Sequence, residues 1–246
     1  MNNIVIFFII VISIVIIGLI VWYLLRDNFE NDNGNKIVLI TEYFKHDNEI
    51  RQREINNSIN KNINNKFINK VYLLNETDTK YPTNSEKIEN IFINKRSTFE
   101  DSFKIANKFQ KGTIVIISNN DISFDNTLNI LQKINLHNTV ICLGRRSYKN
   151  SNKLEYWTKK GLSQDSWIFK TPIKIPNNTN FNFGTSGCDH HIAYLLKSIG
   201  YNLINIPYDI KAEHNHSSNI RIWLKRPISF NNKMINVPIT KLSLED

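Results

Sequence analysis

The sequence predicts a mixed α/β domain with a mostly parallel sheet flanked by helices, preceded by one transmembrane helix. Apolar runs rich in β-branched residues alternate with segments whose apolar residues recur at helical spacing, which is typical of such a sheet. The N-terminal segment is different because it is almost continuously apolar. From residue 36 onward about 210 residues remain, enough for one α/β domain with a substantial core.

The predicted membrane span covers residues 4–25, which include no charged residue. A helix rises about 1.5 Å per residue, so this run is long enough to cross a hydrocarbon core of about 30 Å. Trp22 and Tyr23 end it, where aromatic rings favour the headgroup zone. A cleaved signal peptide is the alternative, but no basic residue precedes the run and no small-residue cleavage site follows it.

We therefore expect an N-terminal anchor at residues 1–26, an Asn/Asp-rich linker at 27–35, a folded domain at 36–230 and a C-terminal tail at 231–246. Arg26 after the span argues for a cytosolic body under the positive-inside rule. A short N-terminus before a large folded body is instead the usual plan of type II anchored enzymes. We expect that plan, in a secretory-pathway or viral-factory membrane.

The net charge of +9 does not predict nucleic-acid binding, because the basic residues are scattered and form no dense cluster beside aromatic residues. A basic balance also suits a phosphate-bearing donor or an anionic membrane surface. Cys142 and Cys188 are the only cysteines, so there is no disulfide framework, and we expect two buried thiols.

The first half of the domain predicts three strands and a helix. Residues 36–41 (KIVLIT) form a continuous β-branched run and predict a buried first strand. Residues 47–61 predict a helix, with Ile50, Ile55 and Ile59 as its apolar stripe. Residues 70–74 (KVYLL) predict a second strand that ends at polar residues, and 87–93 predict a weaker third.

The second half continues the alternation. Residues 97–110 carry aromatic residues at helical spacing, Gly112 ends that helix, and 113–118 (TIVIIS) predict the strongest strand. Residues 127–134 and 189–199 predict helices; 139–143, 202–206 and 210–214 predict strands. Residues 148–172 are expected to be irregular.

Polar residues at the exit of the 113–118 strand predict a metal site. Ligands collect beyond the carboxyl ends of strands in open α/β sheets, and Asn119 and Asp121 follow this strand. Their oxygens are spaced to bind one hard cation, Mg²⁺ or Mn²⁺, which would bridge the phosphates of a nucleotide donor. The alternative is a plain turn, since Asn and Asp commonly follow strands.

Residues 97–125 resemble glycosyltransferases of the GT-A type, of the family-2 kind. The resemblance is carried by Ala106-Asn107, Gly112 and the apolar strand that leads to Asn119-Asn120-Asp121. Asn119 stands where those enzymes have the first Asp, so the chain carries an Asn-x-Asp variant of their Asp-x-Asp motif. The order of elements from residue 36 to about 221 also fits, which implies a Rossmann-like GT-A fold.

The resemblance implies a nucleotide-sugar site at the carboxyl ends of the strands. The residues it assigns to this site are Thr41, Glu42, Asn75, Arg96, Asn107 and Asn119. Arg96 is a candidate to bind a phosphate, against the alternative of a surface charge. Arg145 and Arg146 follow another strand and are weaker candidates of the same kind.

The resemblance also implies a general base at the loop of residues 183–191. Asp189 begins the predicted helix there and would take the proton of an acceptor hydroxyl. The alternative is that Asp189 caps the helix. Asp165 is the second candidate base, Trp167 a candidate platform for a sugar ring, and Gly187 allows close approach of the acceptor.

His214 and His216 are expected to complete the metal site with Asp121. Residues two apart on an extended segment face the same side, so both rings can converge. The resemblance adds that GT-A enzymes often take a metal ligand from a late histidine.

The enzyme expected from these features is a membrane-anchored glycosyltransferase using Mn²⁺ or Mg²⁺. It would move a sugar from a nucleotide-diphosphate donor to a glycan, protein or lipid acceptor. One alternative is a zinc hydrolase that uses His190, His214 and His216 with Asp165 or Asp189. Another is a catalytically degenerate sugar-binding or assembly module, which the Asn119 variant keeps open.

Overall fold

The computed structural model describes residue 16 and residues 36–149, 153–156, 163–218, 220 and 224–242. The chain separates into two compact units, Met1–Asn35 and Lys36–Asp246. Among the described residues, no helix has both the length and the apolar character needed to cross a membrane. The span predicted at residues 4–25 lies outside the described residues except for Ile16, so the anchor and its orientation stay predictions.

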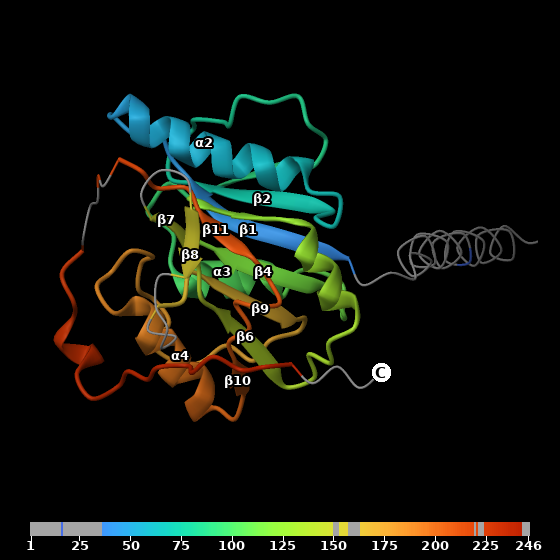
Figure 1. Ribbon diagram of the computed structural model, residues 1–246, viewed down its shortest axis with the longest axis vertical. Helices are drawn as coiled ribbons and strands as arrows, with labels where there is room; N and C mark the ends of the chain where they lie inside the picture. The colour runs from blue at the N-terminus through green and yellow to red at the C-terminus, as the bar shows by residue number, and fades with distance from the viewer. Residues whose placement is uncertain are drawn as a thin grey trace, which may run out of the picture. The chain divides into compact units, whose positions relative to one another are not determined.

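A seven-stranded sheet forms the centre of the second unit (Figure 1). Its strands, in spatial order, are β10 (Asn202–Ile204), β6 (Thr139–Leu143), β9 (Ser166–Lys170), β4 (Ile114–Ser118), β1 (Ile37–Tyr43), β2 (Lys70–Asn75) and β3 (Ile88–Phe92). Only β9 runs against its neighbours, β4 and β6; the other pairs are parallel. The predicted mostly parallel sheet is confirmed, and six of its seven strands were predicted.

A second sheet has four strands. Its order is β5 (Ile122–Phe124), β11 (Ala212–His214), β7 (Arg146–Lys149) and β8 (Lys153–Tyr156). The prediction that residues 148–172 are irregular was wrong, because β7 and β8 pair as antiparallel strands and β9 enters the main sheet. β5 pairs antiparallel with β11, and this pairing sets Ile122 opposite His214.

Helices cover both faces of the main sheet. α2 (Glu49–Asn64) packs on one face, and α3 (Phe99–Ala106) and α4 (Cys188–Ser198) pack on the other (Figure 1). The alternation along β1 explains this, because successive side chains of a strand point to opposite faces. Ile37 and Leu39 join the core beside α2, whereas Val38 and Ile40 join the core beside α3 and α4.

The helix predicted at residues 127–134 is a 3₁₀ helix, η1 (Asn126–Gln132). A 3₁₀ helix brings residues i and i+3 onto one line, so Leu128 and Leu131 are buried together in the core. The Asp125 side chain accepts a hydrogen bond from the Thr127 backbone N–H and begins the helix.

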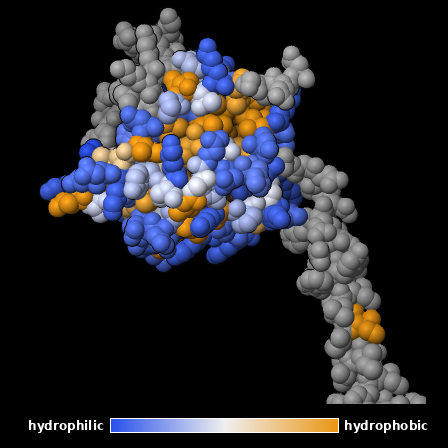
Figure 2. All heavy atoms as spheres, turned by 90° about the horizontal axis from the view of Figure 1, so that it is seen from below, coloured by the Kyte–Doolittle hydropathy of each residue, from blue (hydrophilic) through white to orange (hydrophobic). Residues whose placement is uncertain are grey.

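Residues after 230 pack on the domain as far as the structure describes them. A second short 3₁₀ helix, η2 (Ile228–Phe230), precedes them. Val237 is buried, and the Thr240 N–H donates to the carbonyl of Asn205 at 2.6 Å. On the face shown in Figure 2, hydrophilic residues predominate and hydrophobic residues form smaller groups between them.

Candidate functional site

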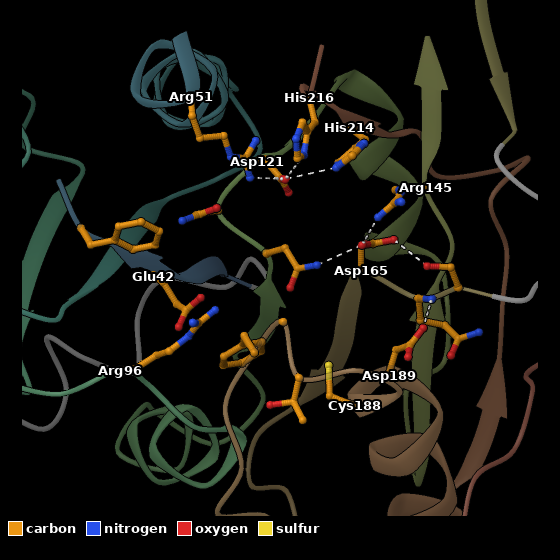
Figure 3. Close-up of a pocket in the computed structure, with 18 of the residues that line it drawn as sticks. Glu42, Arg51, Arg96, Asp121, Arg145, Asp165, Cys188, Asp189, His214 and His216 are labelled. Atoms are coloured by element: carbon orange, nitrogen blue, oxygen red, sulfur yellow. Dashed lines mark hydrogen bonds and ion pairs between the residues drawn. The ribbon is translucent and has the colours of Figure 1, made fainter. Parts of the chain in front are cut away.

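A cleft of about 670 Å³ opens at the carboxyl edge of the parallel strands. Glu42 near the end of β1, Glu76 after β2 and Asn119 after β4 all line it. β9 runs in the opposite direction and therefore brings its first residues to the same edge, where Asp165 precedes it. Figure 3 shows three polar groups around the opening: Asp121 with two histidines, Asp165 with Asp189, and Glu42 with Arg96.

Asp121, His214 and His216 form one of these groups. Asp121 lies in the turn between β4 and β5, and the pairing of β5 with β11 brings His214 to it. The Asp121 Oδ2 atom lies 3.1 Å from Nε2 of His214 and 3.5 Å from Nδ1 of His216. One ligand atom from each residue lies within 4.8 Å of the others, an arrangement that could hold a metal ion.

Two buried atoms of this group have no hydrogen-bond partner among the described residues. They are Oδ1 of Asp121 and Nε2 of His216. Buried polar atoms are almost always bonded, so two such atoms in one group need an explanation. A divalent cation supplies one, since carboxylate oxygens and imidazole nitrogens are its common protein ligands.

The charge of Asp121 is also balanced by Arg51, whose Nη2 atom lies 2.7 Å from Oδ2. Arg51 comes from the first turn of α2. Burial alone would raise the pKa of Asp121, but His214, His216 and Arg51 outweigh it and hold this pKa well below its ordinary range. Asp121 is therefore ionised near neutral pH, the state a metal ligand requires.

Asn119 points away from this group toward Asp165. Its Nδ2 atom donates to Oδ1 of Asp165 at 2.9 Å. The same oxygen accepts from Nη1 of Arg145 at 2.6 Å, and Oδ2 accepts from the Ser163 hydroxyl at 3.3 Å. Both oxygens of Asp165 are thus engaged, and Asp165 is buried.

Asp189 lies in the first turn of α4 but does not cap that helix. The N-cap is Gly187, at φ +79°, with no side-chain capping bond. The Gln164 N–H donates to Oδ2 of Asp189 at 3.4 Å, and Nδ1 of His190 lies 3.5 Å from Oδ1. Burial raises the pKa of Asp189 and the nearby charge of Asp165 adds to the rise, against the opposing effect of His190.

Glu42 and Arg96 form another wall of the cleft. The Ser97 hydroxyl donates to Oε1 of Glu42 at 2.6 Å. Burial raises the pKa of Glu42 to about 7, although Ser97 and Arg96 oppose the rise. A Cβ on Gly184 would lie 3.0 Å from Nη2 of Arg96, so the absence of a side chain leaves room for the guanidinium.

Three residues assigned to the nucleotide site by resemblance are not among the described residues that line the cleft. Thr41 lies within β1 and donates to the Ser118 carbonyl at 2.9 Å. Asn75 donates to the Thr79 carbonyl at 2.9 Å. Asn107 exchanges two hydrogen bonds with the backbone of Ile173, both at 2.8 Å. In each case the polar side chain stabilises the backbone.

The two residues predicted on the acceptor side both line the cleft. Trp167 is only 1% exposed and packs edge-on against Phe99, with ring centroids 4.7 Å apart, so its ring does not present the open face that a platform for a sugar ring needs. Gly187 adopts a left-handed backbone conformation at the loop before α4. Cys142 and Cys188 are free and buried, as predicted.

Sequence reasoning missed Arg51 and Glu54, although a signal was present. Both lie on α2, and Arg51 precedes Ile55 by four residues, so it shares a helix face with the apolar stripe. A charged residue on the buried face of a helix needs a partner. Here the partners are Asp121 and Glu54 for Arg51, and Ser217 and Ser218 for Glu54.

Comparison with known proteins identifies no family: no family model and no curated protein matches the sequence. Solved structures of similar fold include GalNAc-T7 with UDP, GalNAc and Mn²⁺ (10% identity, TM-score 0.48), covering 82% of this chain and 48% of that one. The mannosyltransferase PcManGT from Pyrobaculum calidifontis with GDP-Man and Mn²⁺ has 11% identity and TM-score 0.49, covering 81% and 65%.

A third structure is the 2-C-methyl-D-erythritol 4-phosphate cytidylyltransferase of Francisella tularensis. It has 14% identity and a TM-score of 0.41, and the match covers 77% of this chain and 94% of that one. The chain thus spans about half of the first structure and just under two thirds of the second. At these identities and TM-scores, the function of this chain has to be argued from its own cleft.

Proposed function

We propose that this chain is a metal-dependent glycosyltransferase that moves a sugar from a nucleotide-diphosphate donor to a hydroxyl acceptor. The observation that carries the proposal is the group of Asp121, His214 and His216 at the carboxyl edge of the parallel strands. Ligands of open α/β sheets bind at this edge. The cleft of about 670 Å³ is within the range typical of small-molecule sites.

Asp121, His214 and His216 would hold the cation. When bound, it would neutralise the charge that develops on the leaving diphosphate. Two imidazoles favour Mn²⁺ over Mg²⁺, because Mg²⁺ prefers an all-oxygen octahedron. Because the amide of Asn119 bonds to Asp165, the missing negative charge at Asn119 does not weaken the group of metal ligands. The Asn119 variant is therefore no longer a reason to expect a catalytically degenerate module.

Glu42 and Arg96 would bind the rest of the donor. Both lie on a wall of the cleft that the metal group does not occupy (Figure 3). The Arg96 Nε–H is buried without a hydrogen-bond partner among the described residues. A guanidinium with a free donor matches a phosphate or a ribose hydroxyl.

Asp189 is the better candidate for the general base. Asp165 accepts short hydrogen bonds from Arg145 at 2.6 Å and Asn119 at 2.9 Å, whereas the contacts of Asp189 with Gln164 and His190 are longer, at 3.4 and 3.5 Å. Asp189 would accept the proton of the acceptor hydroxyl. As that oxygen bonds to the anomeric carbon, the bond from this carbon to the diphosphate oxygen breaks. The raised pKa of Asp189 makes it a stronger base than an ordinary carboxylate.

A second candidate function is zinc-dependent hydrolysis. One carboxylate and two imidazoles are also a ligand set of catalytic zinc, which leaves one position for water. This set differs from the zinc ligands expected from the sequence, which included His190, because His190 lies beside Asp189 and is not part of this group. The N-terminal anchor would place either enzyme at a membrane, with a glycan, protein or lipid as the transferase acceptor.

Donor hydrolysis and metal content separate the two functions. The purified full-length chain is incubated with a panel of nucleotide-diphosphate sugars and Mn²⁺, and release of the nucleoside diphosphate is measured. The transferase predicts release that needs Mn²⁺, with weak and exchangeable metal. Stoichiometric zinc that survives dialysis, with no nucleoside diphosphate released, would favour the hydrolase.

A further inference from the structure

α2 holds the segments that carry the metal ligands. Asn62 bonds to β5 directly after Asp121, donating to the Ile122 carbonyl at 2.8 Å and accepting from the Phe124 N–H at 3.0 Å. Lys61 reaches the other segment through Oε2 of Glu213 at 2.6 Å. One helix thus contacts chain segments that are far apart in sequence.

Of the three ligands, His216 is the one that the sheet does not fix. Asp121 is followed at once by β5, and His214 is the last residue of β11. His216 lies two residues beyond that strand. On its N-terminal side, the Asn215 N–H donates to the Asp121 carbonyl at 2.8 Å. The contacts on its C-terminal side therefore help to set the position of the ring.

Glu54 holds that side. Its Oε1 atom accepts from the Ser217 N–H at 2.6 Å, the Ser217 hydroxyl at 2.9 Å and the Ser218 N–H at 2.7 Å. Its Oε2 atom accepts from the Ser218 hydroxyl at 2.9 Å and from Nη1 of Arg51 at 3.1 Å. The residue is 9% exposed, and the other end of the Arg51 guanidinium contacts Asp121.

We propose that Glu54 is a positioning residue for the metal site, which fixes His216 toward Asp121 through Ser217 and Ser218. The inference rests on the proposed metal-dependent function and concerns this same site. A carboxylate suits the task because all five groups that face it are donors. Burial would raise the pKa of Glu54, but the bonds from Ser218, Arg51 and Ser217 outweigh it, and this pKa lies below its ordinary value.

The test is Glu54→Gln in the full-length chain, with Mn²⁺ affinity measured from the electron paramagnetic resonance signal of free Mn²⁺. In either orientation, the amide of Gln directs an N–H₂ at donors: the two backbone N–H groups or Arg51. We expect Mn²⁺ to bind about 10- to 100-fold more weakly, the loss usual for a residue that orients a metal ligand. Glu49→Gln, an exposed residue on the same helix, is the matched control and should bind as wild type.

A double-mutant cycle with His216→Ala identifies the route of the effect. If Glu54 acts through His216, then Glu54→Gln should weaken binding by no more than about twofold in the His216→Ala background. The same loss in both backgrounds, or wild-type affinity in Glu54→Gln, would overturn the inference. Wild-type protein that binds no Mn²⁺ would instead refute the proposed metal function and this inference with it.

A milder variant keeps the test valid if Glu54→Gln does not fold. Ser217→Ala combined with Ser218→Ala removes two hydroxyl donors and keeps the carboxylate and both backbone bonds. We expect Mn²⁺ to bind more weakly than in wild type but more tightly than in His216→Ala. Unchanged affinity in this folded variant would count against Glu54 as the positioning residue.

Discussion

Replacing Asp121 with Asn tests the site at its centre. The substitution keeps the size of the side chain and removes a buried negative charge that contacts Arg51 at 2.7 Å and His214 at 3.1 Å. Breaking one partner out of a buried ion pair destabilises a protein by about 3–5 kcal/mol. Arg51 keeps its second carboxylate, Glu54, at 3.1 Å, so we expect the lower end, about 3 kcal/mol.

The increase in stability on Mn²⁺ binding is the more specific quantity to measure. A ligand that binds only the native state at 100 times its Kd stabilises it by about 2.7 kcal/mol. For a domain of 150–250 residues, about 1 kcal/mol raises Tm by about 2–4 °C, so saturating Mn²⁺ should raise the wild-type Tm by about 5–11 °C. In Asp121→Asn the Mn²⁺-dependent shift should vanish, because the only carboxylate of the ligand group is gone.

The assay is thermal unfolding of the full-length chain, with and without Mn²⁺, followed by circular dichroism. Asp78→Asn is the matched control, since Asp78 is exposed, and should show the wild-type shift. If Asp121→Asn keeps the full Mn²⁺ shift, the cation binds elsewhere and the reasoning fails. A lower Tm without Mn²⁺ is expected in any case and does not by itself support the metal site.

Three further predictions concern other parts of the cleft. The pKa of Glu42 is about 7 in the folded state against 4.5 in the unfolded state, so on raising the pH Glu42 loses its proton first in the unfolded state. The stability that protonated Glu42 contributes is therefore fully present below pH 4.5 and is lost as the pH rises to about 7. This loss is roughly 3 kcal/mol, and urea unfolding across that range should show it as the difference between wild type and Glu42→Gln, because Asp189, whose pKa is also raised, contributes to both proteins. Asp189→Asn should lower the transfer rate about 10²- to 10⁴-fold while the donor-induced Tm shift persists; a full transfer rate would remove Asp189 from the base role. Gly187→Ala should destabilise the folded protein by about 1–2 kcal/mol or more, because residue 187 has a left-handed backbone conformation. The loss should exceed that of Gly112→Ala, because a Cβ at residue 187 would lie 3.0 Å from Met234 Sδ, whereas a Cβ at residue 112 would meet nothing within 4 Å. Equal destabilisation in urea unfolding would show that Met234 moves aside freely.

The fold was predictable where its signals are local. The continuous apolar runs of β1 and β4 lie within single segments, so the sequence pattern alone identified them. In the apolar stripe predicted for α2, Ile55 and Ile59 are buried, but Ile50 is 49% exposed, so its place in the stripe was wrong. β9 was missed because its place is decided by partners remote in sequence: it pairs antiparallel with β4, and Ser118 lies opposite Ser166. No local pattern indicates that a strand will enter between two others against their direction.

The residues of the candidate site could be predicted from the sequence where they directly follow a strand. Asp121 follows a buried strand, and the alternation of an extended segment places His214 and His216 on one side. The position of Arg51 on the buried face of α2 was a signal in the sequence, but the partners of Arg51 and Glu54 could not be identified, because these contacts span 70 and 163 residues. The resemblance also assigned Thr41, Asn75 and Asn107 to the donor. Their side chains bond to nearby backbone or neighbouring strands, a competing use of short polar groups that sequence alone does not exclude.

The central claim is that Asp121, His214 and His216 bind a divalent cation at the diphosphate. The most direct measurement is anomalous diffraction from crystals of the protein soaked in Mn²⁺ with a nucleoside diphosphate. We predict one Mn²⁺ peak within coordination distance of all three side chains, with diphosphate oxygens on its open side. A peak away from these residues, or none at saturating Mn²⁺, would contradict the account.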